Sequence, residues 1–350
     1  MSGSVRAGYV RPLDIRHGQV DLSHGSGGRA MAQLIEQLFA AAFDNEWLGQ
    51  RNDGALLPRP EGRIVVATDC HVVSPLFFPG GDIGCLSVHG TLNDVAMSGA
   101  RPLWLAAGFI LEEGFPLADL QRIVESMARA AREAGVPVVT GDTKVVERGK
   151  GDGVFITTTG VGVVPPGLEI SGDRARPGDR ILISGTVGDH GMAVMSQRES
   201  LAFGTDLVSD TAALHGLVAT MVEAVPTIRV LRDPTRGGLA TTLNEIAAQS
   251  GVGMTIDEAA IPVRPQVEAA CEFLGLDPLY VANEGKLVAI VPAEQAGRLL
   301  ETMRAHPLGR DAAVIGEVGA DPHRFVQMKT RFGGRRIVDW LAGDQLPRIC

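Results

Sequence analysis

Residues 117–144 read LADLQRIVESMARAAREAGVPVVTGDTK, and this stretch decides the fold class. Five apolar side chains in it recur at the spacing of one helix face: Leu120, Ile123, Val124, Met127 and Ala131. Gly135 is a typical helix stop, and the apolar residues 136–139 then predict a short strand that runs into the polar stretch 140–144. A helix followed at once by a strand indicates a chain that layers helices on a sheet.

The same mixture of elements continues in both directions from this unit. Towards the N-terminus we predict helices over 30–43 and 84–98, with strands over 62–68 and 102–110. Towards the C-terminus we predict strands at 154–164, 180–184, 252–256, 286–291 and 312–318, and helices at 188–198, 207–224, 238–249 and 293–305. The polar, Pro- and Gly-containing stretch 165–178 marks a domain boundary. We therefore predict an α+β (mixed α/β) chain with an N-terminal Gly-rich segment and helix (1–44), a first domain (45–168), a second domain (169–331) and a flexible tail (332–350).

Composition excludes several classes of protein. The chain has 350 residues, a net charge of −9 and no run of Lys or Arg, so we expect no nucleic-acid partner. Its longest apolar run, 103–111, is too short to span a membrane, and residues 1–21 lack the apolar core of a signal peptide. The Cys residues form no C-x-x-C pair, which fits a reduced, cytoplasmic setting. We expect Cys70, Cys85 and Cys271 to be inert core thiols in apolar surroundings.

Several carboxylates lie beside glycines or at the ends of predicted elements. Asp53 precedes Gly54, Asp69 follows a predicted strand, and Asp94 lies in a helix rich in small residues. Hard oxygen ligands without His or Cys suit Mg²⁺, which usually bridges to nucleotide phosphates. Each residue alone also suits a cap or a turn. Together they favour a magnesium–nucleotide site.

Glycine-rich turns supply the second group of candidates. Residues 24–28 (HGSGG) and 236–238 (RGG) each precede a predicted helix, and exposed backbone N–H groups in such turns can bind anions. An ordinary helix-entry turn explains each of them equally well. No G-x-x-x-x-G-K-[ST] motif is present, so the chain is not a P-loop protein. Polar loops at 140–144, 233–238 and 283–286 stand beside apolar strands, where loops often carry function.

The chain ends in a thiol, Cys350. Chain ends are usually poorly ordered unless other contacts hold them, so we expect the thiol to be mobile. We expect the neighbouring α-carboxylate to raise the pKa of the thiol and the Arg348 guanidinium to lower it. Taken alone, Cys350 also suits a surface cysteine on a loose end, and Gly333–Gly334 suits a hinge for that end.

Taken together, these stretches resemble the HypE family of nickel–iron hydrogenase maturation factors. That family lies in the superfamily of aminoimidazole ribonucleotide synthetase and selenophosphate synthetase. The stretches that carry the resemblance run in order through nearly the whole chain: HGSGG (24–28), NDGA (52–55), ATD (67–69), HGTLNDVAMSGA (89–100), TGDTKVVERG (140–149), DPTRGGLATTLNEIA (233–247), ANEG (282–285) and PRIC (347–350). The terminal tetrapeptide is specific to this family within the superfamily.

The resemblance implies a two-domain aminoimidazole ribonucleotide synthetase-like fold and an ATP-dependent carbamoyl dehydratase. A carbamoyl group is placed on the terminal Cys by the carbamoyltransferase HypF, and the tail then enters the ATP site. Dehydration leaves a thiocyanate, whose cyanide passes to iron on the HypC–HypD complex. The resemblance also implies a homodimer, joined through its N-terminal domains by a β-barrel-like interface near the nucleotide.

The resemblance also assigns roles to residues of this chain. It makes Cys350 the group that carries the substrate, Glu284 a general base and Lys144 a cation for the phosphoryl group. It assigns Mg²⁺ to the four carboxylates Asp53, Asp69, Asp94 and Asp233. It assigns ATP to Gly25, Ser26, Gly27, Asn93, Asp142, Thr143 and Arg236.

Two alternatives stay open on the sequence. A sister enzyme of the selenophosphate synthetase type would carry a reactive Cys in the N-terminal Gly-rich segment, where this chain has His24 and Ser26. A non-catalytic carrier would bind ATP and present a modified tail without performing the chemistry. The acidic set and Lys144 argue against such a carrier but do not exclude it.

Overall fold

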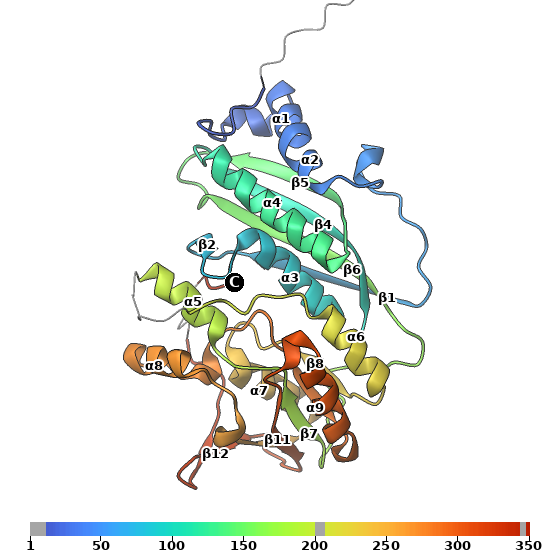
Figure 1. Ribbon diagram of the computed structural model, residues 1–350, viewed down its shortest axis with the longest axis vertical. Coiled ribbons are helices and arrows are strands. Elements are labelled where there is room, and N and C mark those ends of the chain that lie inside the picture. The colour runs from blue at the N-terminus through green and yellow to red at the C-terminus, as the bar shows by residue number, and fades with distance from the viewer. Residues whose placement is uncertain (1–11, 200–206, 344–347) are drawn as a thin grey trace, which may run out of the picture.

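The computed structural model describes residues 12–199, 207–343 and 348–350. Two sheets form two lobes that follow one another along the longest axis, the N-terminal lobe above and the C-terminal lobe below, with the C-terminus between them (Figure 1). No helix in these described ranges is long and apolar enough to cross a membrane. The two-lobed mixture of helices and sheets confirms the predicted α+β class.

The first lobe is built on a four-stranded sheet in the order β1–β6–β4–β5. Its strands are β1 (Arg63–His71), β4 (Arg101–Glu112), β5 (Val138–Val146) and β6 (Val154–Val164). Only β4 and β5 are parallel, because helix α4 (Leu117–Ala134) connects them as a crossover. Helix α4 ends at Gly135 in the left-handed conformation, as its sequence predicts. Its apolar face and that of α3 (Ile83–Ala96) pack into the core of the lobe.

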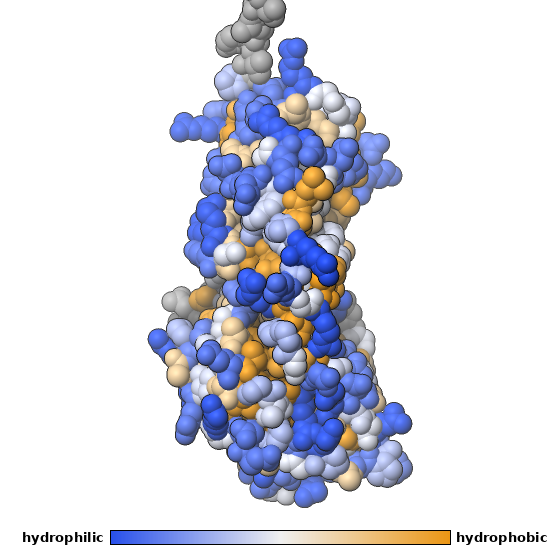
Figure 2. Space-filling model, turned by 90° about the vertical axis from the view of Figure 1, so that its right-hand side faces the viewer, coloured by the Kyte–Doolittle hydropathy of each residue, from blue (hydrophilic) through white to orange (hydrophobic). Residues whose placement is uncertain are grey.

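The other face of this sheet carries exposed apolar side chains. Ile64 and Val66 on β1 are 60% and 62% exposed, and Ile110 on β4 is 43% exposed. Seen from the side on which β1 lies in Figure 1, apolar side chains gather around the middle of the molecule (Figure 2). Patches of this kind commonly mark a surface that binds another protein.

Residues 22–50 and 77–82 form short elements beside this sheet. The elements are the 3-10 helices η1 (Leu22–Gly25) and η3 (Leu48–Gln50), helices α1 (Arg29–Leu34) and α2 (Ala41–Phe43), the π-helical turn η2 (Ile35–Ala40), and strands β2 (Phe77–Phe78) and β3 (Gly81–Asp82). The helix expected over 30–43 is present, and its middle winds as a π-helix.

The second lobe is built on a seven-stranded sheet in the order β13–β12–β9–β11–β7–β10–β8. Its strands are β7 (Arg180–Ile183), β8 (Val230–Arg232), β9 (Gly253–Asp257), β10 (Val288–Val291), β11 (Ala313–Gly319), β12 (Val326–Lys329) and β13 (Arg335–Ile337). The continuous apolar run of β7 is explained by burial on both faces: Ile181 and Ile183 pack into one core and Leu182 into another.

Helices cover both faces of this second sheet. The helices of this lobe are α5 (Asp189–Arg198), α6 (His215–Ala224), α7 (Gly238–Ser250), α8 (Pro265–Leu274) and α9 (Ala296–Ala305), with 3-10 turns η4 (Glu258–Ala260), η5 (Pro278–Tyr280), η6 (Ala293–Gln295) and η7 (Pro307–Gly309). Leu239 and Leu243 of α7 belong to the core that contains Ile181, whereas Leu217 of α6 and Leu299 of α9 belong to the core that contains Leu182.

The structure differs from the sequence prediction in several places. Residues 140–144, expected as a polar loop, belong to strand β5. The helix expected over 207–224 begins only at His215, because residues 209–214 are held in an irregular path by tertiary hydrogen bonds. For example, the Asn93 side chain binds Ala212 O and Leu214 N. The expected tail begins later than residue 332, because Arg335–Ile337 form strand β13 and Val338 is fully buried.

The Gly333–Gly334 pair forms the turn between β12 and β13 and is therefore not a hinge of the tail. Thr330 N–H donates to Gly334 O, and Gly333 N–H donates to Thr330 O. Residues 344–347 of the expected tail, which include Pro347, lie outside the described residues.

Candidate active site

The terminal residues dock between the two lobes. The Val72 N–H donates to the main-chain oxygen of Cys350 (3.0 Å), and the Ser74 N–H donates to Arg348 O (3.1 Å). The partners run in opposite directions, so the terminus extends the chain after β1 as a short antiparallel pairing. Ile349 is 3% exposed and belongs to the core of the first lobe. Hydrogen bonds and burial thus fix the position of the terminal residue, although the sequence predicts a poorly ordered chain end.

The Cys350 thiol lies beside Arg236, with 3.6 Å between Sγ and Nη2. Burial raises the pKa of the thiol to about 12, the nearby Glu284 carboxyl adds to the rise, and Arg236 opposes it. The prediction that Arg348 lowers this pKa is wrong, because the Arg348 guanidinium forms an ion pair with Asp152. The cation that lowers the pKa of the thiol is instead Arg236, in the turn before α7.

Carboxyl groups from both lobes gather around this thiol. Asp69 lies on β1, Asp94 on α3, Asp233 directly after β8, and Glu284 shortly before β10. Burial, reinforced by Asp233 and Asp69, raises the pKa of Asp94 to about 7. Burial raises the pKa of Asp233 to about 6 against opposition from Arg232, and Asp69 adds to the rise. The cluster holds more negative charge than its neighbours offset, so it favours a cation.

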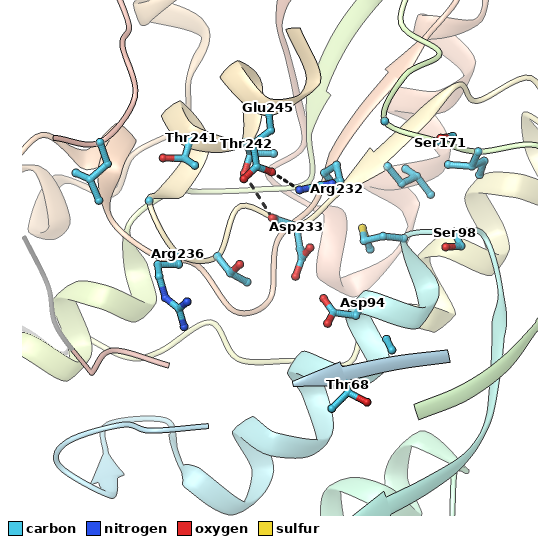
Figure 3. Close-up of a pocket in the computed structure, with 18 of the residues that line it drawn as sticks. Thr68, Asp94, Ser98, Ser171, Arg232, Asp233, Arg236, Thr241, Thr242 and Glu245 are labelled. Atoms are coloured by element: carbon cyan, nitrogen blue, oxygen red, sulfur yellow. Dashed lines mark hydrogen bonds and ion pairs between the residues drawn. The ribbon is translucent and has the colours of Figure 1, made fainter. Parts of the chain in front are cut away.

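A cavity of about 870 Å³ opens onto this cluster. Asp94 and Asp233 face one another across it, and Arg236 reaches in from the turn before α7 (Figure 3). Hydroxyl groups of Ser98, Ser171 and Thr241 lie around its wall. Arg232 forms an ion pair with Glu245 at its edge, so its charge is already engaged.

A buried polar network formed by Asp210 and Lys286 holds Glu284 in place. Its own N–H donates to Asp210 Oδ1 (3.1 Å), and Asp210 Oδ2 accepts from Lys286 Nζ (2.9 Å). Burial and the neighbouring carboxylates raise the pKa of Glu284 well above its usual value. Within the described residues, its Oε1 has no hydrogen-bond partner. A buried carboxyl group with an unpartnered oxygen is suited to exchange a proton with a ligand.

The predicted nucleotide residues Gly25, Ser26, Gly27, Asp142 and Thr143 lie elsewhere, around β5. Gly25 packs against Val145, where a Cβ would come within 2.9 Å of the Val145 Cβ. Asp142 and Thr143 line a second cavity, of about 770 Å³, whose apolar wall includes Phe39 and Phe109.

Lys144 lies on the same strand and forms an exposed ion pair with Asp142, with 2.9 Å between Nζ and Oδ2. Strands β5 and β1 are the two edges of the four-stranded sheet. At about 4.8 Å per strand, Lys144 and Asp69 are therefore separated by roughly 14 Å of sheet within one chain.

Two other predicted site residues, Asp53 and Asn93, contribute no available side chain to the acidic cluster. Asp53 is exposed, between residues that line the second cavity. Asn93 is buried, and its amide group bonds to Ala212 O, Glu284 O and Leu214 N. In the part of the chain that the structure describes, no three His, Cys, Asp or Glu side chains are arranged as a ready metal site.

The three other cysteines differ in their surroundings. Cys271 is buried, as predicted, and burial raises its pKa to about 12. Cys85 is half-buried at the start of α3. The prediction of a core setting is wrong for Cys70, which is exposed on the open face of the first sheet, beside Thr157.

The sequence analysis missed His190, Arg198 and Asp210, which contact the docked tail or Glu284. Asp210 and Arg198 lie in no recognisable motif, and His190 stands in a helix without a metal-type partner. Lys286 follows the polar stretch 283–285, which is the one sequence signal that points to this network.

Comparison with known proteins gives two family-model matches and close relatives. The N-terminal domain of AIR synthase related proteins matches residues 51–164, and their C-terminal domain matches residues 176–329. Carbamoyl dehydratase HypE of Azotobacter vinelandii is 75% identical over 338 residues, which cover 97% of this chain and 99% of that protein.

Two solved structures are also similar. A crystal structure of hydrogenase maturation protein HypE in complex with ATP has a TM-score of 0.91 at 54% identity, and the match covers 94% of this chain and 99% of that one. The corresponding chain of a HypE–HypF complex has a TM-score of 0.78 at 54% identity, covering 88% and 99%.

Proposed function

The chain belongs to the carbamoyl dehydratase HypE family, whose fold is that of AIR synthase related proteins, and from this premise we propose an ATP-dependent dehydration of its own terminus. The substrate is a carbamoyl group on Cys350, and the product is the S-cyanate. The oxygen of the carbamoyl group leaves with the phosphoryl group of ATP as phosphate, and both nitrogen protons are removed. The cyanide then serves as a ligand of iron in a nickel–iron hydrogenase.

One observation carries this proposal: the docked Cys350 thiol lies beside Arg236, and Glu284 and Asp69 are near enough to raise its pKa. At pH 7 a thiol with a pKa of about 12 is ionised in about one molecule in 10⁵, against about one in 100 at the ordinary pKa near 9. Because the thiolate is the nucleophile, the docked thiol is a poor acceptor of a carbamoyl group. Loading therefore belongs to the undocked tail and dehydration to the docked tail.

Glu284 is the general base of the proposed reaction. It is 4% exposed, one of its oxygens has no hydrogen-bond partner among the described residues, and its charge raises the pKa of the Cys350 thiol. A carboxyl group with a raised pKa is a stronger base once it is ionised. Arg236 would donate hydrogen bonds to the sulfur or oxygen of the carbamoyl group and hold it towards Glu284.

The acidic cluster fits Mg²⁺. Burial raises the pKa values of Asp94 and Asp233, and neighbouring carboxylates add to the rise, so a divalent ion beside them would favour their ionised forms. Mg²⁺ commonly uses one or two protein carboxylates together with phosphate oxygens and water, so the lack of a three-residue group among the described residues suits it. Asp69, Asp94 and Asp233 would hold the ion, which would offset charge on the transferring phosphoryl group.

The second cavity fits the base of the nucleotide. Its apolar wall of Phe39 and Phe109 suits a planar ring, and its polar side carries Asp142 and Thr143. ATP binding here rests on the ATP complex of the similar HypE structure. ATP supplies the phosphoryl group that turns the carbamoyl oxygen into a leaving group.

A homodimer would join the two groups of residues. The exposed side chains of Ile64, Val66 and Ile110 make the open face of the first sheet a suitable interface, where two sheets close into a barrel. Pairing the β5 edge of one protomer with the β1 edge of its partner would bring the strand that carries Lys144 beside the strand that carries Asp69. Lys144 would then act as a cation for the phosphoryl group.

The proposed partners follow from the same chemistry. HypF would load the undocked Cys350, in keeping with the HypE–HypF complex among the similar structures. An iron-binding HypC–HypD complex would accept the cyanide, and all steps would take place in the cytoplasm.

The test is to incubate the protein with HypF, carbamoyl phosphate and ATP and to measure its intact mass. We expect a carbamoyl group on Cys350, followed by the loss of one water during ATP turnover. Glu284→Gln and Asp94→Asn should keep the first change and slow the second by about 10²-fold or more. Glu272→Gln, at an exposed position of α8, serves as the matched control for charge removal. A modification that survives Cys350→Ala, or unchanged dehydration by Glu284→Gln, would refute the proposal.

A further inference from the structure

His190 on α5 is a fully buried side chain that the proposed chemistry does not use. Its Nε2 lies 2.7 Å from Ile349 O, and its Nδ1 lies 2.8 Å from Ser209 Oγ. Both ring nitrogens are therefore engaged, one with the docked tail and the other with the segment before α6. A buried ring that bridges these two segments is placed to control the position of the tail.

The hydrogen-bond partners define which nitrogen carries the proton. Ile349 O can only accept, so His190 Nε2 must be the donor. Burial lowers the pKa of His190, which favours the neutral ring with one proton. Nδ1 must then accept from the Ser209 hydroxyl, whose oxygen in turn accepts from the Thr211 N–H (3.1 Å). Ser209 thus holds the ring in the Nε2–H form.

Arg198, at the end of the same helix, contacts the tail one residue earlier. Its Nη2 lies 2.6 Å from Ser74 O and 2.8 Å from Arg348 O, so one guanidinium joins the tail to the chain on which it docks. Together with the Val72 and Ser74 N–H groups, these side chains bind the main-chain oxygens of all three terminal residues. Main-chain recognition of this kind fixes residues 348–350, while the thiol makes its own contact with Arg236.

We propose that His190 is a positioning residue that holds the docked tail through Ile349 O and so sets the Cys350 thiol between Arg236 and Glu284. This inference rests on the proposed function for its purpose, because the same residue would position the carbamoyl group for dehydration. Ser209 supports His190 by fixing its tautomer, and Arg198 supplies the second side-chain contact.

Alkylation of the full-length protein by iodoacetamide at pH 8, followed by peptide mass spectrometry, tests the proposal. The labelling rate of Cys70, on the open face of the first sheet, is the internal reference in every sample, whatever share of that face a dimer covers. His190→Leu fills the site without a donor, and the lost hydrogen bond should speed alkylation of Cys350 about tenfold while Cys70 is unaffected. His190→Gln keeps a donor near the Nε2 position and should restore slow alkylation, which a merely space-filling role for His190 would not explain.

Unchanged alkylation of Cys350 in a folded His190→Leu protein, or equal alkylation in the Leu and Gln proteins, would overturn the proposal. If His190→Leu does not fold, Ser209→Ala takes its place, and the loss of the tautomer lock should speed Cys350 alkylation several-fold. An unchanged rate in that protein would be equally decisive against it. The labelling needs neither ATP nor HypF, so a failure of dehydration would remove the proposed function without touching this result.

Discussion

Shortening Ile349 should weaken docking of the tail in proportion to the apolar volume removed. Ile349 is 3% exposed and packs into the core of the first lobe, so it is the apolar anchor of the terminus. Ile→Ala changes at buried sites cost about 2–5 kcal/mol, of which the three lost carbons account for about 2.4 kcal/mol by transfer alone. At about 1.4 kcal/mol per factor of ten, the ratio of docked to undocked tail should fall by a factor of about 30 or more.

The assay is single-turnover dehydration that starts from protein already carbamoylated on Cys350. Since only the docked tail is dehydrated, Ile349→Ala should slow the loss of water. Ile349→Val, which removes one methyl group and lowers the ratio of docked to undocked tail by a factor of about 2–12, should slow it less. Loading by HypF uses the undocked tail, so its rate should not fall in either protein.

Ile337→Ala is the matched control, because Ile337 is 52% exposed on β13 and does not contact the tail site. It should dehydrate at the unchanged rate. The reasoning fails if Ile349→Ala dehydrates as fast as the unaltered protein, or if Ile337→Ala slows the reaction as much as Ile349→Ala does.

Two further predictions concern the thiol and the base. Docking raises the pKa of Cys350 to about 12, so the protonated thiol favours the docked state. This contribution to docking is fully present below the ordinary thiol pKa near 9 and is lost as the pH rises from 9 towards 12. Tail exposure measured by digestion with a carboxypeptidase should increase over that range in the unaltered protein but not in Cys350→Ser, and equal curves would contradict the shift. Gly285→Ala should displace Glu284 and destabilise the protein, because a Cβ there would lie 1.8 Å from Asp210 O. Gly297→Ala, at an exposed position of α9 with open space around it, should instead raise the free energy of unfolding by about 0.5–1 kcal/mol. If thermal melts show the same change in stability for both variants, the predicted clash at Gly285 is wrong.

The elements that the sequence predicts well are those whose signals are local. Helix α4 has its apolar face, and its stop at Gly135 is a glycine with φ of 68°. Strands β8, β12 and β13 are only three or four residues long, which is too short to show a period, and the sequence analysis missed them. Residues 207–214 carry a helical pattern, but their path is determined by Asn93 and Pro79, far away in sequence.

The residues of the candidate site also differ in how well the sequence predicts them. Asp69, Asp94, Asp233, Arg236 and Glu284 lie in recognisable stretches, and the structure brings them together around Cys350. By contrast, His190 and Arg198 bind main-chain oxygens of the tail. A main-chain acceptor has no side-chain signature, so no pattern in the sequence could have paired these residues with the terminus.

The contacts of the docked tail are few enough to make docking reversible. Four hydrogen bonds hold its main chain, from Val72, Ser74, His190 and Arg198, and at about 1 kcal/mol each they contribute about 4 kcal/mol. Burial of Ile349 adds about 2–3 kcal/mol, and the Arg348–Asp152 pair at the surface adds at most about 1 kcal/mol. Ordering three residues costs about 3–6 kcal/mol of backbone entropy, and fixing their side chains costs more. The favourable side is larger by a small margin, so the tail is mostly docked but can leave to be loaded and return to be dehydrated. Loss of any one contact should shift this equilibrium measurably.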